Sequence, residues 1–451
     1  MRQSFNEGAG HGGATPGDGT PGAETPGGER RERAVAVALM KATQDRAECL
    51  EHLDELIQLA DTAGADVIDQ VLQQRARPDT ATWIGKGKAE HLKAVAAELE
   101  ATLILADDDL SPAQARNLER LTGLPVVDRS GLILDIFARR ARTREARTQV
   151  ELAQLKYLLP RLTRAWSHLE RQRGGIGLRG PGETQLETDR RMVRTRIRQL
   201  EQELERIDRQ RDTRRQGRED IYRVALVGYT NVGKSTLLNR LTGADVLVEN
   251  RLFATLDATV RRLKLEDGSE VLLSDTVGFI RKLPHHLVAS FRSTLREAAE
   301  ADLLLHVIDL SHPQMEAQIR TVREVLQELG AAETPVLHVF NKADLVEDPA
   351  LMQSAVAAHA PAVLVSATQG LRLEQLLEQV AGSRGARERQ VRLLLPWEHH
   401  GLSARLRASL RVLEQESSPE GTRFLVSLPI SSAEDLLRPF VKKGCVIEEK
   451  W

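Results

Sequence analysis

The chain has 451 residues, a formal net charge of -2 and two cysteines, Cys49 and Cys445. This length suits roughly three domains. Two cysteines exclude a disulfide framework and a zinc site, and reduced thiols are typical of cytosolic proteins. Because the N-terminus has no apolar segment suited to a signal peptide or a membrane span, we expect a cytoplasmic protein. Residues 1–30 are rich in Gly, Pro and Thr, which predicts a disordered tail.

Residues 31–130 alternate short apolar runs with helical patterns, which predicts a small N-terminal α/β domain with a largely parallel sheet. Ser111 and Pro112 place a helix N-cap before a proline at the first helical position. The expected strands are 34–40, 66–73 and 102–105, and the expected helices are 46–63, 89–99 and 111–121.

Residues 131–218 consist mainly of helix-forming residues and are basic. From Arg139 to Arg218 there are 22 Lys and Arg against 11 Asp and Glu. Two long helices are expected, at 143–172 and 187–214, separated by five glycines and a proline in 174–182 that cannot continue a helix. This pattern predicts a helical hairpin arm with a flexible tip.

Residues 219–384 again alternate strands and helices, with strands expected at 223–228, 270–275, 303–309, 336–341 and 362–366. The order of residues 390–451 is strand, helix, strand, helix, strand, which predicts a small α+β C-terminal domain.

A phosphate-binding loop follows the strand at 223–228. The residues Gly228-Tyr229-Thr230-Asn231-Val232-Gly233-Lys234-Ser235 fit the pattern G-x-x-x-x-G-K-[ST] and precede a Leu-rich helix that includes Thr236. Backbone N–H groups of such a loop point at phosphate oxygens. We expect Lys234 to reach the β- and γ-phosphates and the Ser235 hydroxyl to bind Mg²⁺.

Two further segments complete the expected phosphate site. The motif Asp275-Thr276-Val277-Gly278 ends a strand about 40 residues after the P-loop, where Asp275 would hold Mg²⁺ and the Gly278 N–H would meet the γ-phosphate. Between them lies Phe253-Ala254-Thr255-Leu256-Asp257. A Thr from this loop should complete the magnesium shell. Thr255 and Thr259 are both candidates, and we favour Thr255.

The motif Asn341-Lys342-Ala343-Asp344 also ends a strand. A carboxylate at Asp344 can accept hydrogen bonds from N1 and N2 of guanine, a donor pair that adenine lacks, so this motif favours GTP over ATP. Ser366-Ala367-Thr368 follows the next strand, and a backbone N–H there should meet guanine O6. Together the motifs predict a GTP-hydrolysing enzyme in which Lys234, Thr255 and Gly278 act in catalysis.

Phe279 follows Gly278, where many GTPases carry a Gln that orients the attacking water. A phenyl ring cannot form that hydrogen bond, so intrinsic hydrolysis should be slow and externally activated. In similar GTPases that lack this Gln, an Asn at the position of Asn231 can coordinate K⁺ beside the phosphates. The alternative is that Asn231 only braces the loop.

Several strings outside these motifs resemble the HflX family of GTPases over about residues 33–382. They are Trp83-Ile84-Gly85-Lys86-Gly87-Lys88, residues 127–141, the glycine-rich segment 174–191, residues 253–257 and residues 275–279. The segment Gly85–Lys88 alternatively suggests a second phosphate loop, although it lacks the G-x-x-x-x-G-K-[ST] spacing.

The resemblance implies a ribosome-associated GTPase that binds the large ribosomal subunit and splits or rescues stalled ribosomes, with the arm tip near the peptidyl-transferase region. Arg139, Arg140, Arg173 and Arg179 would then contact ribosomal RNA. We expect a monomer that uses GTP or GDP, Mg²⁺ and K⁺, without DNA binding or stable membrane insertion. Two alternatives stay open: a ribosome-assembly or tRNA-modification GTPase, and a regulatory switch that binds an acidic protein or membrane surface.

Overall fold

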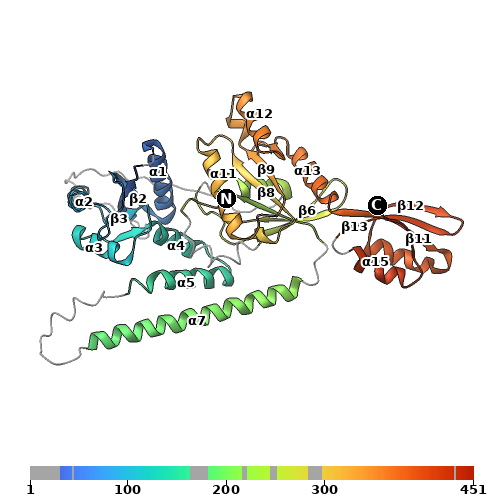
Figure 1. The fold of residues 1–451 in the computed structure, drawn as a ribbon, viewed down its shortest axis with the longest axis horizontal. Coiled ribbons are helices and arrows are strands. Elements are labelled where there is room, and N and C mark those ends of the chain that lie inside the picture. Colours follow the sequence, from blue (N-terminus) through green and yellow to red (C-terminus); the bar gives the residue numbers. More distant parts are fainter. Residues whose placement is uncertain are drawn as a thin grey trace, which may run out of the picture.

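The computed structural model describes residues 31–42, 45–162, 181–215, 221–243, 251–282, 297–430 and 433–450. Three β-sheets lie in a row along the longest axis, and a pair of long helices runs beside the first two (Figure 1). The expected fold class, an α/β protein with a mostly parallel GTPase sheet, a helical hairpin and a C-terminal α+β domain, is confirmed.

The first sheet is parallel, in the order β2-β1-β3-β4, and has helices on both faces. Alternate residues of β1 point to opposite faces, so Ala34 and Ala36 pack with α1 while Val35 and Val37 pack towards α2 and α3. Ser111 caps α3 as expected, in a reciprocal pair with Gln114. The elements are β1 Glu32–Met40, α1 Arg46–Ala63, β2 Ala65–Gln74, α2 Lys86–Glu98, β3 Leu103–Ala106, α3 Pro112–Thr122 and β4 Val126–Asp128.

Helix α4, Arg129–Arg140, follows β4 directly and is not among the expected elements. The domain boundary expected at residue 130 falls inside it. The buried side chains of α4 include Leu132, Ile136 and Phe137, which share one apolar core with Leu53 and Leu56 of α1. Burial of this apolar face therefore attaches the start of the arm to the first sheet.

The arm consists of α5, Arg144–Leu158, and α7, Pro181–Arg215, which run antiparallel side by side (Figure 1). Ion pairs from Arg196 to Glu151 (2.6 Å) and from Lys156 to Glu201 (2.8 Å) join them. Helix α5 ends at Leu158 and is followed by turns at 159–162. Helix α7 begins at Pro181, before the expected start at 187. The rest of the expected first helix and the arm tip lie outside the described residues.

The middle sheet has the order β10-β9-β8-β5-β7-β6 and is parallel except for β6, which pairs antiparallel with β7. The edge strand β6 is absent from the expected elements because most of its side chains are polar and exposed. The elements are β5 Arg223–Gly228, α8 Lys234–Thr242, β6 Thr259–Lys264, β7 Glu270–Asp275, β8 Leu303–Asp309, α11 Met315–Glu328, β9 Val336–Asn341, η1 Ala343–Leu345, α12 Pro349–Ala358, β10 Ala362–Leu364 and α13 Leu373–Gly385.

The C-terminal sheet is antiparallel, in the order β12-β13-β11-β14. The expected order of strand, helix, strand, helix, strand is wrong. The segment between the two helices α14 and α15 forms a hairpin of two strands, β12 and β13, where one strand was expected. Since β12 is an exposed edge strand, its sequence has little apolar alternation. The elements are β11 Glu388–Pro396, η2 Trp397–Leu402, α14 Ser403–Ser409, β12 Arg411–Ser418, β13 Gly421–Pro429, α15 Ala433–Val441 and β14 Val446–Lys450.

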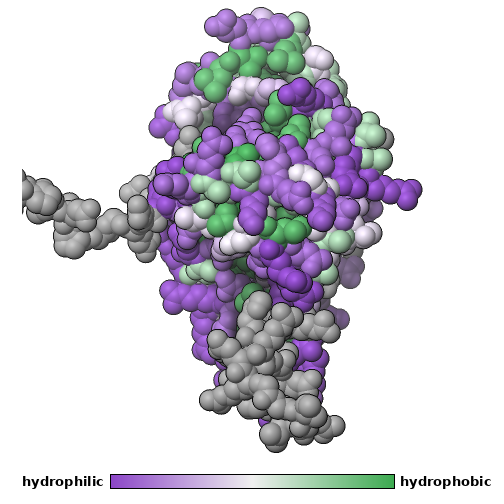
Figure 2. All heavy atoms as spheres, turned by 90° about the vertical axis from the view of Figure 1, so that its left-hand side faces the viewer, coloured by the Kyte–Doolittle hydropathy of each residue, from purple (hydrophilic) through white to green (hydrophobic). Residues whose placement is uncertain are grey.

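The end of the molecule formed by the first sheet presents mainly hydrophilic side chains, with apolar ones scattered among them (Figure 2). None of the helices in the described ranges is long and apolar enough to cross a membrane. The first and middle sheets share a continuous apolar core that joins Leu56, Phe137 and Val227. This shared core fixes the first unit beside the P-loop.

Candidate nucleotide-binding site

The P-loop connects β5 to α8, as its sequence predicts. Gly228 has a φ of 151°, and a Cβ there would lie 2.2 Å from the Val307 carbonyl oxygen. Gly233 has a φ of 93° and closes the loop. The Lys234 ammonium group is buried and donates to the carbonyls of Gly228 (3.2 Å) and Tyr229 (2.8 Å). Burial lowers its pKa to about 8, and Asp275 opposes this shift.

Three oxygen-bearing side chains converge at the N-terminus of α8. Ser235 Oγ donates to Asp275 Oδ2 (2.6 Å) and lies 2.8 Å from Thr255 Oγ1. Asp275 is fully buried, and its Oδ1 has no hydrogen-bond partner. Burial raises its pKa, while Lys234 and the two hydroxyls oppose the shift. Hard oxygen ligands beside an unpartnered carboxylate oxygen fit Mg²⁺.

The geometry favours Thr255 over Thr259 as the third oxygen ligand. Thr255 reaches Ser235, whereas Thr259 is the first residue of β6 and pairs through the backbone with Asp275. A residue inside a strand ladder has its position fixed by that pairing.

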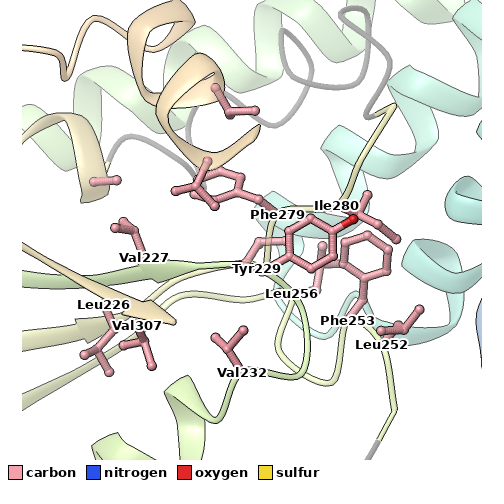
Figure 3. Close-up of a cluster of buried hydrophobic side chains, with 14 of the residues drawn as sticks. Leu226, Val227, Tyr229, Val232, Leu252, Phe253, Leu256, Phe279, Ile280 and Val307 are labelled. Carbon is pink, nitrogen blue, oxygen red and sulfur yellow. The ribbon is translucent and has the colours of Figure 1, made fainter. Parts of the chain in front are cut away.

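The loop after β7 is attached to the P-loop by its backbone. Thr230 N–H donates to the Phe279 carbonyl (2.8 Å), and Phe279 N–H donates to the Gly228 carbonyl (3.0 Å). The Phe279 ring is 1 % exposed and belongs to an apolar cluster with Tyr229, Phe253 and Ile280 (Figure 3). Phe279 therefore packs under the site and offers no polar group to it.

On the expected guanine side, Asn341 connects three loops. Its Nδ2 donates to the Val232 carbonyl (2.8 Å), and its Oδ1 accepts from the Ala367 N–H (2.9 Å). The Ala367 N–H, one of those expected to face guanine O6, is thus used within the protein. Lys342 forms an ion pair with Asp309 (2.6 Å).

Asp344 has the free hydrogen-bonding capacity that guanine requires. Its Oδ1 is buried without a partner, and its Oδ2 has only a long contact of 3.5 Å from Gln369 Nε2. A buried carboxylate oxygen without a donor is costly unless a ligand supplies one. Ser366 and Thr368 lie close by, with their hydroxyl oxygens 3.2 Å apart.

Several predicted site residues turn their side chains away from the phosphates. The Tyr229 hydroxyl hydrogen-bonds Glu55 of α1 and accepts from the Arg281 N–H (2.8 Å). Asp257 contacts the arm instead of the pocket. Val232, Phe253, Leu256 and Val277 are buried in apolar surroundings. Only their backbone groups can serve a nucleotide.

The residues that line the hollow at the P-loop are polar or small, apart from Phe253. They are Thr230, Asn231, Gly233, Lys234, Ser235, Thr236, Arg251, Phe253, Ala254, Thr255, Thr276 and Gly278. Arg251 is one that the sequence motifs missed, because it belongs to no motif and only the course of its loop brings it here. Asp309, which forms the ion pair with Lys342 and does not line this hollow, was missed as well, although its place at the end of β8 was a signal.

Of the four arginines expected to bind RNA, the structure describes only Arg139 and Arg140. Arg139 and Arg140 end α4, while Arg173 and Arg179 lie outside the described residues. Helix α7 instead exposes Arg191, Arg194 and Arg198. Their spacing of three and four residues places them on one face of the helix.

A P-loop, a buried magnesium-type carboxylate and a guanine-type acceptor on one parallel sheet define a P-loop GTPase. Family models match in chain order: "GTP-binding GTPase N-terminal" over residues 50–138, "GTP-binding GTPase Middle Region" over 140–218 and "50S ribosome-binding GTPase" over 223–342.

GTPase HflX of Caldanaerobacter subterraneus subsp. tengcongensis is 48% identical over 393 residues, which cover 87% of this chain and 90% of that protein. GTPase HflX of Escherichia coli K12 is 47% identical over 388 residues, covering 85% and 90%. The chain belongs to the HflX family of ribosome-binding GTPases, and it hydrolyses GTP. The GDP complex of a Sulfolobus solfataricus GTP-binding protein is 26% identical, with TM-score 0.41, and covers 77% of this chain and 98% of that chain.

Replacing Asp344 by Asn should weaken GTP binding and favour xanthosine nucleotides. An Asn amide presents a donor where guanine N2 also donates, whereas xanthine has an oxygen there. We expect the preference for GTP over XTP to fall by about 10²-fold or more, since each buried hydrogen-bonding mismatch is strongly rejected. Fluorescent GDP and XDP titrations measure this. Unchanged GDP affinity in the variant would contradict the assignment of Asp344 to the base.

Proposed function

We propose that this protein binds the large ribosomal subunit in its GTP-bound state, splits or rescues stalled ribosomes, and hydrolyses GTP faster on the ribosome. The family supports a ribosomal partner. The observation that carries the proposal is a contact between the loop expected to sense the γ-phosphate and the first helix of the arm.

That contact is made by Asp257. Its Oδ2 accepts from the backbone N–H groups of Arg142 (3.0 Å) and Thr143 (3.2 Å), and its Oδ1 accepts from the Thr143 hydroxyl (2.6 Å). Thr143 is the N-cap of α5. A carboxylate beside a helix N-terminus is also favoured by the helix dipole. Asp257 therefore fixes α5 to the nucleotide loop.

Phe253 adds an apolar contact to the same loop. Its ring meets Phe137 of α4 edge to face, with ring centroids 4.7 Å apart. Both side chains are buried. Rearrangement of residues 251–258 on GTP hydrolysis would break this packing and release Asp257, so the position of the arm follows the nucleotide.

The arm supplies the RNA-binding face. Arg191, Arg194 and Arg198 form a basic stripe on the exposed side of α7. Arginines at this spacing contact successive phosphates and release their counterions, which favours a ribosomal RNA partner.

At the site, we assign the phosphates to the P-loop amides and Lys234, the γ-phosphate to the Gly278 N–H, and guanine to Asp344. Mg²⁺ held by Ser235, Thr255 and Asp275 would neutralise charge on the β- and γ-phosphates.

Co-sedimentation of the full chain with separated ribosomal subunits tests the partner. We expect pelleting with large subunits in a non-hydrolysable GTP analogue and little in GDP. Charge reversal at Arg191 and Arg194 should weaken binding about tenfold or more and flatten its salt dependence, since fewer counterions are released. Deleting residues 174–182 should also weaken binding to large subunits.

The matched control reverses Arg320 and Arg323, an exposed pair at the same spacing on α11. Reversal there should leave pelleting intact. The partner assignment fails if binding is to small subunits or tRNA, or if both arm variants pellet like the wild type.

Replacing Asp257 by Ala should uncouple the arm from the nucleotide. The affinity for GDP should stay within about threefold, because the Asp257 side chain points to the arm and away from the phosphates. The GTP-bound protein should no longer bind large subunits much more tightly than the GDP-bound protein does: we expect the ratio of the two affinities to fall about tenfold. Thr143→Val removes only the hydroxyl contact and keeps the two backbone donors, so it should have a smaller effect in the same direction. The double variant should add little to Asp257→Ala, as expected for two partners of one contact. A full nucleotide dependence in both single variants would refute the coupling.

Turnover without ribosomes should be slow and faster in K⁺ than in Na⁺. Asn231 has a φ of 62°, is exposed and borders the hollow at the P-loop. This position suits a side-chain amide oxygen that would bind a cation together with the phosphates. A cation there would offset charge that develops in the transition state. Asn231→Ala should abolish the difference between the salts. Equal wild-type rates in both salts would eliminate the cation and leave the ribosome as activator.

A further inference from the structure

The γ-phosphate end of the hollow contains one buried hydroxyl that the established motifs do not use. Thr230 is 6 % exposed, and its Oγ1 has no hydrogen-bond partner. The residue lines the hollow together with Lys234 and Gly278. A buried hydroxyl left without a partner costs free energy, which a ligand in the hollow would recover.

The position of Thr230 relative to the expected γ-phosphate follows from Gly278. A Cβ built on Gly278 would lie 2.8 Å from Thr230 Cα, 2.8 Å from Thr230 Cγ2 and 3.0 Å from Lys234 Nζ. Thr230 and the Gly278 backbone are therefore in contact, with the Lys234 ammonium beside both. These are the groups assigned above to the terminal phosphate, so Thr230 lies at that end of the hollow, with its Cγ2 methyl towards Gly278.

The backbone holds Thr230 in this place. Its N–H donates to the Phe279 carbonyl (2.8 Å), which aligns it with the loop that carries Gly278. A residue whose backbone is fixed in this way needs little further ordering to position a reactant.

Other hydroxyls that line the hollow are already engaged or differently placed. Ser235 and Thr255 lie with Asp275, and Thr276 Oγ1 donates to the Leu226 carbonyl (2.6 Å). Thr236 is a half-buried residue of α8. Phe279, at the position where a Gln would stand, has a buried apolar ring. Among the described lining residues, Thr230 is thus the buried hydroxyl with unused hydrogen-bonding capacity.

We propose that the Thr230 hydroxyl orients the attacking water, the role that Phe279 cannot perform. The water oxygen bonds to the γ-phosphorus while the bond from that phosphorus to the β,γ-bridging oxygen breaks, and GDP leaves with the electron pair. The water proton passes to a γ-phosphate oxygen. Thr230 Oγ1 accepts a hydrogen bond from the water. The hydroxyl keeps its own proton throughout and is unchanged at the end of the reaction.

This inference rests on the nucleotide site assigned under the proposed function, but not on the ribosome. It is tested in the full chain without ribosomes by single-turnover GTP hydrolysis and by titration with fluorescent GDP. Thr230→Val keeps the shape and removes the hydroxyl, whereas Thr230→Ser keeps the hydroxyl and removes the methyl. We expect Val to slow hydrolysis on the order of 10²-fold and Ser to retain the rate within about fivefold, as for loss of one transition-state hydrogen bond.

GDP affinity should stay within about threefold in both variants, because a water-orienting group contributes in the transition state and not to nucleotide binding. Binding of GDP with aluminium fluoride, which mimics the transferring phosphoryl group, should be lost in Val and kept in Ser. Wild-type hydrolysis in Thr230→Val would overturn the proposal, and so would a loss of nucleotide affinity without a change in the hydrolytic rate. Failure of the wild type to bind GDP would instead refute the site assignment.

Discussion

Two reciprocal backbone hydrogen bonds hold the P-loop against the loop that follows β7. They join Thr230 to Phe279 and Phe279 to Gly228, and they bring Gly278 against Lys234. The link uses backbone atoms alone, and the Phe279 ring is buried below the loop (Figure 3). Phe279, whose ring offers no polar group to the hollow, is thus also the residue that joins the loop after β7 to the P-loop. Burial of its ring, worth roughly 2 kcal/mol or more, favours this arrangement.

The same loop is attached to the first sheet through charged and polar groups. Arg129 is fully buried and pairs with Glu55 and with Asp107 (2.8 Å), and Lys282 also reaches Asp107 (2.7 Å). Burial raises the pKa of Asp107 to about 6, and Lys282 opposes the shift. Buried charges persist only when paired, so the contact of Lys282 with Asp107 favours one relative position of the first unit and the loop after β7.

These two attachments give the nucleotide loops neighbours on both sides. Tyr229 turns from the P-loop to Glu55, and Asp257 turns from its own loop to Thr143 at the arm. Under the coupling proposed above, a change at the γ-phosphate would reach α1 through Tyr229 and α5 through Asp257. Such contacts have two discrete states, made or broken, which suits a switch better than a continuous deformation.

The motif residues and their order were readable from the sequence because each motif is local. A glycine-rich turn, a carboxylate at a strand end and the strand–loop–helix context are set by neighbouring residues. The parallel sheets and most element positions followed from periodicity for the same reason. Polar, exposed edge strands such as β6 and β12 have no such pattern, and α4 follows β4 without a turn signal, so these elements were missed.

What the sequence by itself determined is the class of enzyme and the base that it selects, through residues 228–236, 275–278 and 341–344. Only the tertiary structure decided where the side chains of Tyr229 and Asp257 point, and that the Thr230 hydroxyl is buried without a partner. The contact of Asp257 with Thr143 joins residues 114 positions apart, and that of Tyr229 with Glu55 joins residues 174 apart. Such pairings depend on how separate elements pack, and no local pattern specifies them.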